Sequence, residues 1–266
     1  IVLRQEILDS GIYYAYWETE WGGNFVPYVE KCARLGFDVL EVACGAFDRE
    51  NDAFFHELAA AARANGMTLT GGYGPRKEHD LATADNAQAE QTFRFYADMF
   101  RKMELAGIDR LGGALYSYWP APCGPETAAD KAAETARSAA RMRRLADMAA
   151  DHGITLGMEA LNRFEGYLIN TAQECIDYVR AVDRPNVKVM LDTFHMNIEE
   201  DDMVEAIRTA GPYLGHFHTG ENNRRTPGTG KLPWKEMAQA LKDIHYEGAL
   251  VMEPFVLMGG SIAYDI

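Results

Sequence analysis

The chain has 266 residues, of which 47% are hydrophobic and 25% are charged, and its formal net charge is −14. This acidic balance argues against nucleic acid as a partner, because binding to a phosphate backbone needs a basic face. No apolar run approaches the roughly 20 residues of a membrane-spanning helix, so no membrane partner is expected. The length suits either one large α/β barrel or two smaller domains.

The cysteines and the first residues of the chain bear on its compartment. Cys32, Cys44, Cys123 and Cys175 are scattered and form no CxxC pair, which suggests neither a zinc knuckle nor a disulfide framework. Free thiols suit a reducing compartment. No basic segment followed by an apolar stretch opens the sequence, so no signal peptide is visible. We therefore expect a cytoplasmic protein.

Short apolar segments and longer segments with helical spacing alternate along the whole chain. The expected strands are Gly11–Tyr16, Asp38–Ala43, Met67–Gly72, Arg110–Leu115, Leu156–Glu159, Val187–Asp192, Leu214–His218 and Ala249–Glu253. The expected helices are Phe25–Leu35, Asp52–Asn65, Ala84–Ala106, Ala128–His152, Ala172–Val182, Met203–Ala210 and Trp234–Ile244. Glycine directly follows four of these helices, at Gly36, Gly66, Gly107 and Gly153, which is a typical stop signal.

Strict alternation of strands and helices favours a parallel sheet. Eight such units in a chain of this length predict a single (β/α)₈ TIM-barrel domain over residues 1–266, since roughly 250 residues is typical of that fold. An open doubly wound sheet is the alternative, but the first turn between strand and helix, Trp17–Asn24, lacks a GxGxxG fingerprint. An eighth helix is expected after the last strand and is apparently missing, because the chain stops at Ile266.

Four chemically active side chains close the last four predicted strands: Glu159, Asp192, His218 and Glu253. A single acid in such a place is as readily a salt bridge or a helix cap as a ligand. Four at equivalent positions favour one site, because the carboxyl ends of neighbouring barrel strands meet at the same mouth. Three carboxylates and one imidazole form a hard, oxygen-rich set that favours Mn²⁺ or Mg²⁺, with Co²⁺ acceptable. We call these the four strand-end residues.

Other side chains are expected around this mouth. His195, in the loop after Asp192, would lie beside the metal and within reach of a substrate hydroxyl, although a lone loop histidine is more often structural. Glu165 and Arg224 are loop charges for which a solvated position is an equal alternative. His216 is expected on the opposite face of its strand from His218, packed or supporting the site from outside. Aromatic walls for a sugar, or core packing, are the two interpretations of Tyr13, Trp17, Trp21 and Trp119.

Several segments together resemble the ketose 3-epimerases, the D-tagatose/D-psicose (allulose) 3-epimerase family of xylose isomerase-like barrels. These segments are Gly11–Trp21, Glu159–Glu165, Leu191–Glu200, Gly215–Glu221, Gly230–Trp234 and Val251–Phe255. The resemblance covers nearly the whole chain, and the combination is specific to the family although no segment is specific to a substrate. The chain departs from the family at Gly71–Pro75 and at Thr219, and both could touch the distal end of a sugar.

The resemblance implies a site and its ligands. It implies that the four strand-end residues bind one divalent metal per subunit, typically Mn²⁺, and that Glu159 and Glu253 are also the acid/base pair. It implies that Glu165, His195 and Arg224 hold O1 to O3 of the ketose. It places Tyr13, Trp119 and Phe255 in the sugar pocket. It also implies a free ketose as substrate and a homodimer or homotetramer as the assembly.

The expected reaction is metal-dependent epimerisation at C3 of free ketoses, of the D-psicose/D-fructose or D-tagatose/D-sorbose type, through a cis-enediolate with one glutamate on each face. L-ribulose 3-epimerase activity or aldose–ketose isomerisation on the same barrel are the alternatives, and the second is disfavoured because no lysine stands at a strand end. A metal-dependent AP endonuclease needs a trinuclear zinc site, for which 7 histidines and an acidic chain are a poor match. A sugar-binding protein without catalysis would not need two metal-bound carboxylates on opposite faces.

Overall fold

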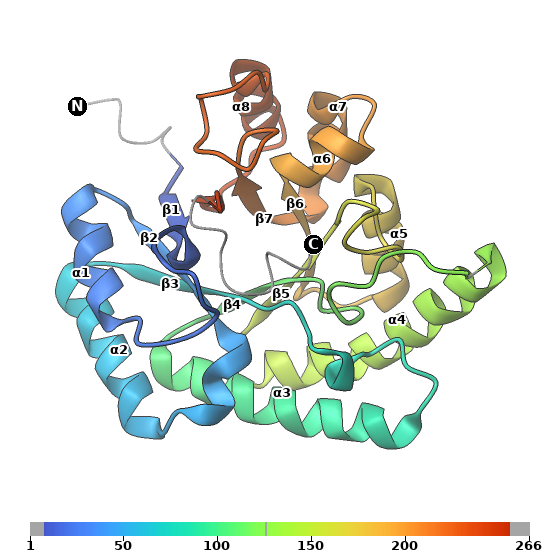
Figure 1. The fold of residues 1–266 in the computed structure, drawn as a ribbon, viewed down its shortest axis with the longest axis horizontal. Helices are drawn as coiled ribbons and strands as arrows, with labels where there is room; N and C mark the ends of the chain where they lie inside the picture. Colours follow the sequence, from blue (N-terminus) through green and yellow to red (C-terminus); the bar gives the residue numbers. More distant parts are fainter. Residues whose placement is uncertain (1–7, 126, 256–266) are drawn as a thin grey trace.

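The computed structural model describes residues 8–125 and 127–255, in which parallel strands close into a barrel (Figure 1). The strands are β1 (Ser10–Tyr13), β2 (Val39–Ala43), β3 (Thr68–Gly72), β4 (Arg110–Gly113), β5 (Thr155–Glu159), β6 (Val187–Asp192), β7 (Leu214–Thr219) and β8 (Leu250–Met252). Each strand pairs with the next in the chain, and β8 pairs with β1 through Gly11 and Val251. The predicted TIM barrel is therefore confirmed, and the open sheet is excluded.

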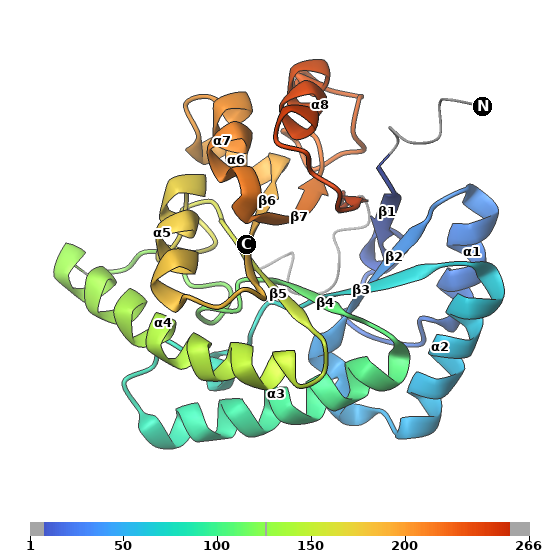
Figure 2. The same ribbon diagram turned by 180° about the vertical axis from the view of Figure 1, so that it is seen from behind.

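The helices pack around the outside of the barrel, as the two opposite views show (Figures 1 and 2). They are α1 (Val26–Leu35), α2 (Asp52–Asn65), α3 (Asn86–Ala106), α4 (Ala128–Ala150), α5 (Ala172–Val182), α6 (Thr193–Glu199), α7 (Met203–Ala210) and α8 (Trp234–Asp243). Each of the seven predicted helices is present, and its bounds agree with the prediction to within two residues. The short helix α6 was not predicted. The helix expected after β8 falls outside the described residues. None of the helices in the described part of the chain combines the length and hydropathy that crossing a bilayer requires.

Local sequence signals explain where the helices begin and end. The Asn51 side chain accepts hydrogen bonds from the backbone N–H groups of Ala53 and Phe54 and so caps the first turn of α2. The same helix ends at Gly66, whose φ of 64° lies in the left-handed region that glycine adopts without strain. These signals lie in the sequence itself, which is why the helix bounds were predictable.

The first strand is shorter than predicted. It ends at Tyr13 because Tyr14–Trp17 form a 3₁₀ turn. This turn brings the chain across the mouth of the barrel after Tyr13, so the segment from Tyr13 to Trp21 supplies part of the cavity wall there. The fourth strand likewise ends at Gly113, two residues earlier than predicted.

Small residues in the barrel interior make room for larger neighbours. A Cβ at Gly112 would lie 2.5 Å from Met190 Sδ and 3.4 Å from a ring carbon of His216. A Cβ at Gly157 would make only ordinary contacts with the Met190 and His216 side chains, at 3.4 Å and 3.7 Å. Glycine at position 112 therefore leaves the space that the buried Met190 side chain occupies inside the barrel.

Candidate active site

The four strand-end residues converge as the sequence predicts. Glu159 and Asp192 are the last residues of β5 and β6, His218 is the last but one of β7, and Glu253 follows β8 directly. One oxygen or nitrogen atom from each of them lies within 4.8 Å of the others. Asp192 and His218 are buried, Glu159 is nearly so, and Glu253 is partly exposed. The barrel thus brings three carboxylates and one imidazole to a single point at its carboxyl end.

The orientation of His218 fits a bound cation. Its Nε2 is hydrogen-bonded to Glu41, so that Nδ1 is turned toward the carboxylates and lies 3.3 Å from Glu253 Oε2. This buried Nδ1 has no hydrogen bond of good geometry within the described part of the chain, and its contact with Glu253 is an ion pair. A cation placed between them would satisfy both the ring nitrogen and the carboxylate. The oxygen-rich donor set with one nitrogen is of the kind that holds Mn²⁺, Mg²⁺ or Co²⁺, and we regard it as a candidate metal-binding site.

The charged side chains at this point strongly affect one another's pKa values. Burial, together with the nearby Glu253 carboxylate, raises the pKa of Glu159 well above its ordinary value. For Asp192, burial acts in the same direction but the Arg224 guanidinium and the neighbouring histidines outweigh it and hold the pKa low. The carboxylates at this point therefore differ in how readily they hold a proton.

Arg224 lies inside the carboxylate cluster instead of in a solvated loop. Its guanidinium forms an ion pair with Asp192 and donates to Glu253 Oε2 at 2.8 Å. The group is held between two phenyl rings, 4.4 Å from the centroid of Phe194 and 4.7 Å from that of Phe255. Flat cationic groups stack well on aromatic faces. The arginine is therefore fixed at the cavity, where its remaining N–H groups can reach a polar ligand.

His195 is also at the site, but not in a loop as predicted. The Asp192 side chain accepts a hydrogen bond from the Phe194 N–H at 2.9 Å, so the chain turns directly from β6 into the short helix α6. The Asn162 backbone N–H donates to His195 Nδ1 at 3.2 Å, and burial lowers the pKa of the ring. The neutral ring therefore carries its proton on Nε2, which lies 3.7 Å from Glu159 Oε1. This nitrogen also lies 3.8 Å from Asp192 Oδ2, so its N–H faces the cluster of strand-end carboxylates.

Glu165 is anchored at the cavity by two donors. The Asn162 side chain donates to its Oε1 at 2.8 Å, and the Trp119 indole N–H donates to its Oε2 at 3.1 Å. Because Asn162 also supports His195, one amide side chain orients two of the predicted substrate-binding residues. Carboxylate oxygens have further acceptor capacity, so Glu165 can still receive a hydrogen bond from a sugar hydroxyl.

The converging side chains surround a cavity of about 330 Å³, within the range of small-molecule sites at roughly 300–1,000 Å³. Its polar lining includes Glu159, Glu165, His195, His218, Arg224 and Glu253, and its aromatic lining includes Tyr13, Trp21, Trp119 and Phe255. The predictions for Tyr13, Trp21 and Trp119 as walls agree with this placement. Trp17 follows the other interpretation, core packing, because its ring stacks on Tyr28 at a centroid separation of 5.6 Å and is not part of the cavity lining.

The two places where the chain departs from the family differ in position. Gly72, Tyr73 and Gly74 line the cavity, and a Cβ at Gly74 would lie 2.8 Å from the Trp119 ring. Thr219 is not part of the lining, since its hydroxyl is buried and donates to the Val251 carbonyl at 3.4 Å. Only the loop after β3 can therefore alter direct contacts with a ligand.

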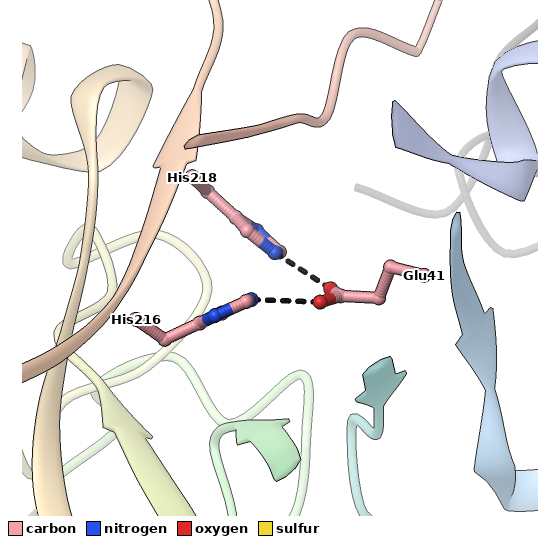
Figure 3. Close-up of side chains that lie close together, drawn as sticks. All are labelled: Glu41, His216 and His218. Atoms are coloured by element: carbon pink, nitrogen blue, oxygen red, sulfur yellow. Dashed lines mark hydrogen bonds and ion pairs between the residues drawn. The ribbon is translucent and has the colours of Figure 1, made fainter. Parts of the chain in front are cut away.

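Sequence reasoning misplaced His216 and missed Glu41 altogether. His216 and His218 face the same way, into the barrel, because residues two apart on a strand share a face; the opposite expectation was wrong. Both rings are hydrogen-bonded to the buried carboxylate of Glu41 on β2 (Figure 3). An acid within the otherwise apolar strand Val39–Ala43 was the available signal, since a buried carboxylate has to be paired.

Comparison with known proteins places this chain in a family. The model of the xylose isomerase-like TIM barrel family matches residues 29–258. The chain is 50% identical to a D-psicose 3-epimerase of Ruminiclostridium cellulolyticum H10, over 97% of this chain and 88% of that one. It is also 50% identical to a D-psicose 3-epimerase of Agrobacterium fabrum C58, over 97% and 89%.

Solved structures agree with the sequence comparison. A crystal structure of the D-psicose 3-epimerase from Clostridium cellulolyticum H10 with D-tagatose superimposes with a TM-score of 0.93 at 50% identity, over 97% of this chain and 88% of that one. This chain therefore has the same barrel as an epimerase, and its sequence is similar to that epimerase over nearly all of its length. This chain belongs to the ketose 3-epimerase family of xylose isomerase-like TIM barrels and is an isomerase of that family.

Proposed function

We propose that this epimerase inverts C3 of free ketoses in a reaction that depends on one divalent metal ion. The observation that carries the proposal is the convergence of the four strand-end residues at the carboxyl end of the barrel, where Glu159, His218 and Glu253 line one cavity together with His195, Glu165 and Arg224. Such a site combines a place for a cation, two carboxylates that can exchange protons, and neutral or charged donors for sugar oxygens. Epimerisation next to a carbonyl can use all three of these features.

The four strand-end residues would hold the metal, with His218 contributing Nδ1. When bound, a divalent ion would act as a Lewis acid on the ketose and would make the C3 proton, next to the carbonyl, more acidic. Mn²⁺ is the ion we propose, with Co²⁺ and Mg²⁺ as alternatives that suit the same ligand set.

Glu159 and Glu253 are the proposed acid and base. They arrive from β5 and β8, which are separated by β6 and β7 around the closed ring. From there one carboxylate can remove the C3 proton on one face of the sugar, and the other can return a proton to the opposite face of the planar cis-enediolate. The charge of the bound cation and the buried position would together set the pKa of Glu159, which has to accept and release a proton.

The surrounding residues would fix the sugar. His195 presents its Nε2–H, Glu165 presents acceptor oxygens and Arg224 presents guanidinium N–H groups, which together would bind O1 to O3. Tyr13, Trp119 and Phe255 would pack against the carbon skeleton. Such fixed contacts hold the reacting carbon between the two glutamates, and positioning of this kind contributes strongly to catalysis.

The names of the relatives make D-psicose and D-fructose the first substrate pair to propose, with D-tagatose and D-sorbose next. No lysine is among the described residues that line the cavity, which is against the alternative of aldose–ketose isomerisation. L-ribulose remains the alternative substrate.

We further propose a cytoplasmic homodimer or homotetramer. A panel of free ketoses incubated with enzyme and Mn²⁺, with products separated by chromatography, tests this function; absence of any C3 epimer from every ketose would contradict it.

Sugar charge gives a separate prediction. Free ketohexoses should have a kcat/KM at least about tenfold higher than that of their 6-phosphates, equivalent to about 1.4 kcal/mol. The reason is that two of the three arginines in the described cavity lining are already paired, Arg224 with Asp192 and Glu253 and Arg76 with Asp48 and Glu78, while the third, Arg49, is exposed to solvent. Steady-state kinetics on D-fructose and D-fructose 6-phosphate measure the ratio. A preference for the phosphate ester would show that the cavity is built for an anion.

A further inference from the structure

Glu41 is a fully buried carboxylate in the middle of β2. It accepts three hydrogen bonds, from Thr70 Oγ1 at 2.7 Å, from His216 Nε2 at 2.7 Å and from His218 Nε2 at 2.6 Å. Figure 3 shows the carboxylate reaching across the barrel interior to both rings, which project from β7. An ionised carboxylate can only accept, so both histidines must donate from Nε2. Glu41 thereby ties β2 to β7 directly behind one of the proposed metal ligands.

The bond to Glu41 determines which nitrogen of His218 is free. In the neutral tautomer that carries its proton on Nε2, the lone pair is on Nδ1, the atom that lies 3.3 Å from Glu253 Oε2. Histidines that bind metals usually donate their other ring N–H to a carboxylate or carbonyl, and this partner fixes both the tautomer and the direction of the ring. The short hydrogen bond that His218 donates from Nε2 to Glu41 is an arrangement of this kind.

We propose that Glu41 is a positioning residue for the metal centre, which holds His218 with Nδ1 free to ligate a divalent cation. The inference rests on the proposed metal site and extends it to a residue that would touch neither metal nor sugar. His216 has a different part: it shares the same carboxylate but its own Nδ1 does not belong to the cluster of strand-end residues. It supports Glu41 from the side away from the site.

The same three residues could in principle form a second metal site, since Glu41, His216 and His218 each offer an atom within 4.8 Å of the others. The contacts favour hydrogen bonds. Each ring nitrogen faces a different carboxylate oxygen at 2.6–2.7 Å, and the Thr70 hydroxyl already donates to Oε2. An ion placed between them would have to displace two protons and compete with that hydroxyl. The number of metal ions bound per chain therefore distinguishes a hydrogen-bonded cluster from a second metal site.

The first test compares Mn²⁺ binding by calorimetry in metal-stripped wild type, Glu41→Gln and Thr70→Val. Glu41→Gln should weaken Mn²⁺ affinity by about 10–100-fold, as is typical when a carboxylate behind a metal-bound histidine is lost. The amide has one acceptor oxygen for three donors and adds an N–H₂ group, so it no longer enforces the Nε2–H form of His218. Thr70→Val removes a donor from the same carboxylate but leaves the bond to His218, and its affinity should stay close to wild type.

A second measurement needs no change at Glu41. In ¹⁵N-histidine NMR spectra of the Mg²⁺-loaded wild type, the His218 ring should be protonated on Nε2 and unprotonated on Nδ1. His216→Asn assigns the other ring of the pair. A His218 ring protonated on Nδ1 would overturn the proposal, even if Glu41→Gln failed to fold.

The remaining outcomes are distinguishable. Wild type that binds no Mn²⁺ would remove the metal site, and with it both the proposed function and this inference. Tight binding by wild type with unchanged affinity in folded Glu41→Gln would overturn the positioning role alone. Two Mn²⁺ ions per wild-type chain, falling to one in His216→Asn, would show that Glu41 is a ligand of a second metal.

Discussion

Replacing either Glu159 or Glu253 with glutamine is expected to lower kcat by roughly 10²–10⁴-fold, the usual contribution of a positioned acid or base. Glutamine keeps the size of the side chain and one oxygen that can face the metal, but it cannot accept the proton from C3. If the two carboxylates act on opposite faces of the sugar, each is the base in one direction and the acid in the other. Both variants should therefore lose activity in both directions while still binding the ketose.

The measurement is steady-state kinetics at saturating Mn²⁺, with bound metal determined by elemental analysis for each variant. Glu90→Gln is the matched control, because it makes the same chemical change in a surface ion pair with Arg144 on the outside of the barrel. Near-normal kcat in either Glu159→Gln or Glu253→Gln, with metal still bound, would leave one glutamate dispensable and contradict the two-base assignment.

Removal of the metal should have the other large effect. Dialysis against EDTA is expected to abolish activity and lower the thermal stability, and Mn²⁺ or Co²⁺ should restore both. A ligand present at 100 times its Kd stabilises the folded state by about 2.7 kcal/mol, which corresponds to roughly 5–10 °C in Tm for a chain of this size. Here the loss is reinforced because three carboxylates are brought together at a buried point, where their mutual repulsion is poorly screened.

Activity and Tm are followed in parallel on the same preparations, with EDTA presaturated with Mn²⁺ as the control for the chelator itself. Full activity in protein whose freedom from metal has been verified by elemental analysis would exclude the proposed chemistry. An unchanged Tm after removal of metal would show that the strand-end carboxylates do not hold it.

The barrel and the core of the site were predictable because local patterns in the sequence determine them. Alternating apolar and helical periods predict the β/α order, and parallel strands in a closed barrel must place their carboxyl ends at one mouth. Glu159, Asp192, His218 and Glu253 occupy equivalent places at those ends, so their convergence follows once the fold is known. The family resemblance added the roles that position alone does not indicate.

The features that were missed depend on contacts between distant segments. Glu41 lies on β2 and meets His218 across the barrel, 177 residues away in sequence, so no local pattern pairs them. The charge of Arg224 inside the carboxylate cluster and the support of His195 by Asn162 arise in the same way. The helix at His195 was different: Asp192 is a good N-cap, and only the assumption that a strand must be followed by a loop concealed it.

The most direct test of the central claim is the fate of the C3 proton in D₂O. If Glu159 and Glu253 exchange protons with solvent on opposite faces of C3, the epimer formed by the wild-type enzyme should carry deuterium at C3, as ¹H and ²H NMR of the purified product would show. Product formed in D₂O with C3 unlabelled would mean that the hydrogen is transferred without passing through an exchangeable base, and would contradict the account.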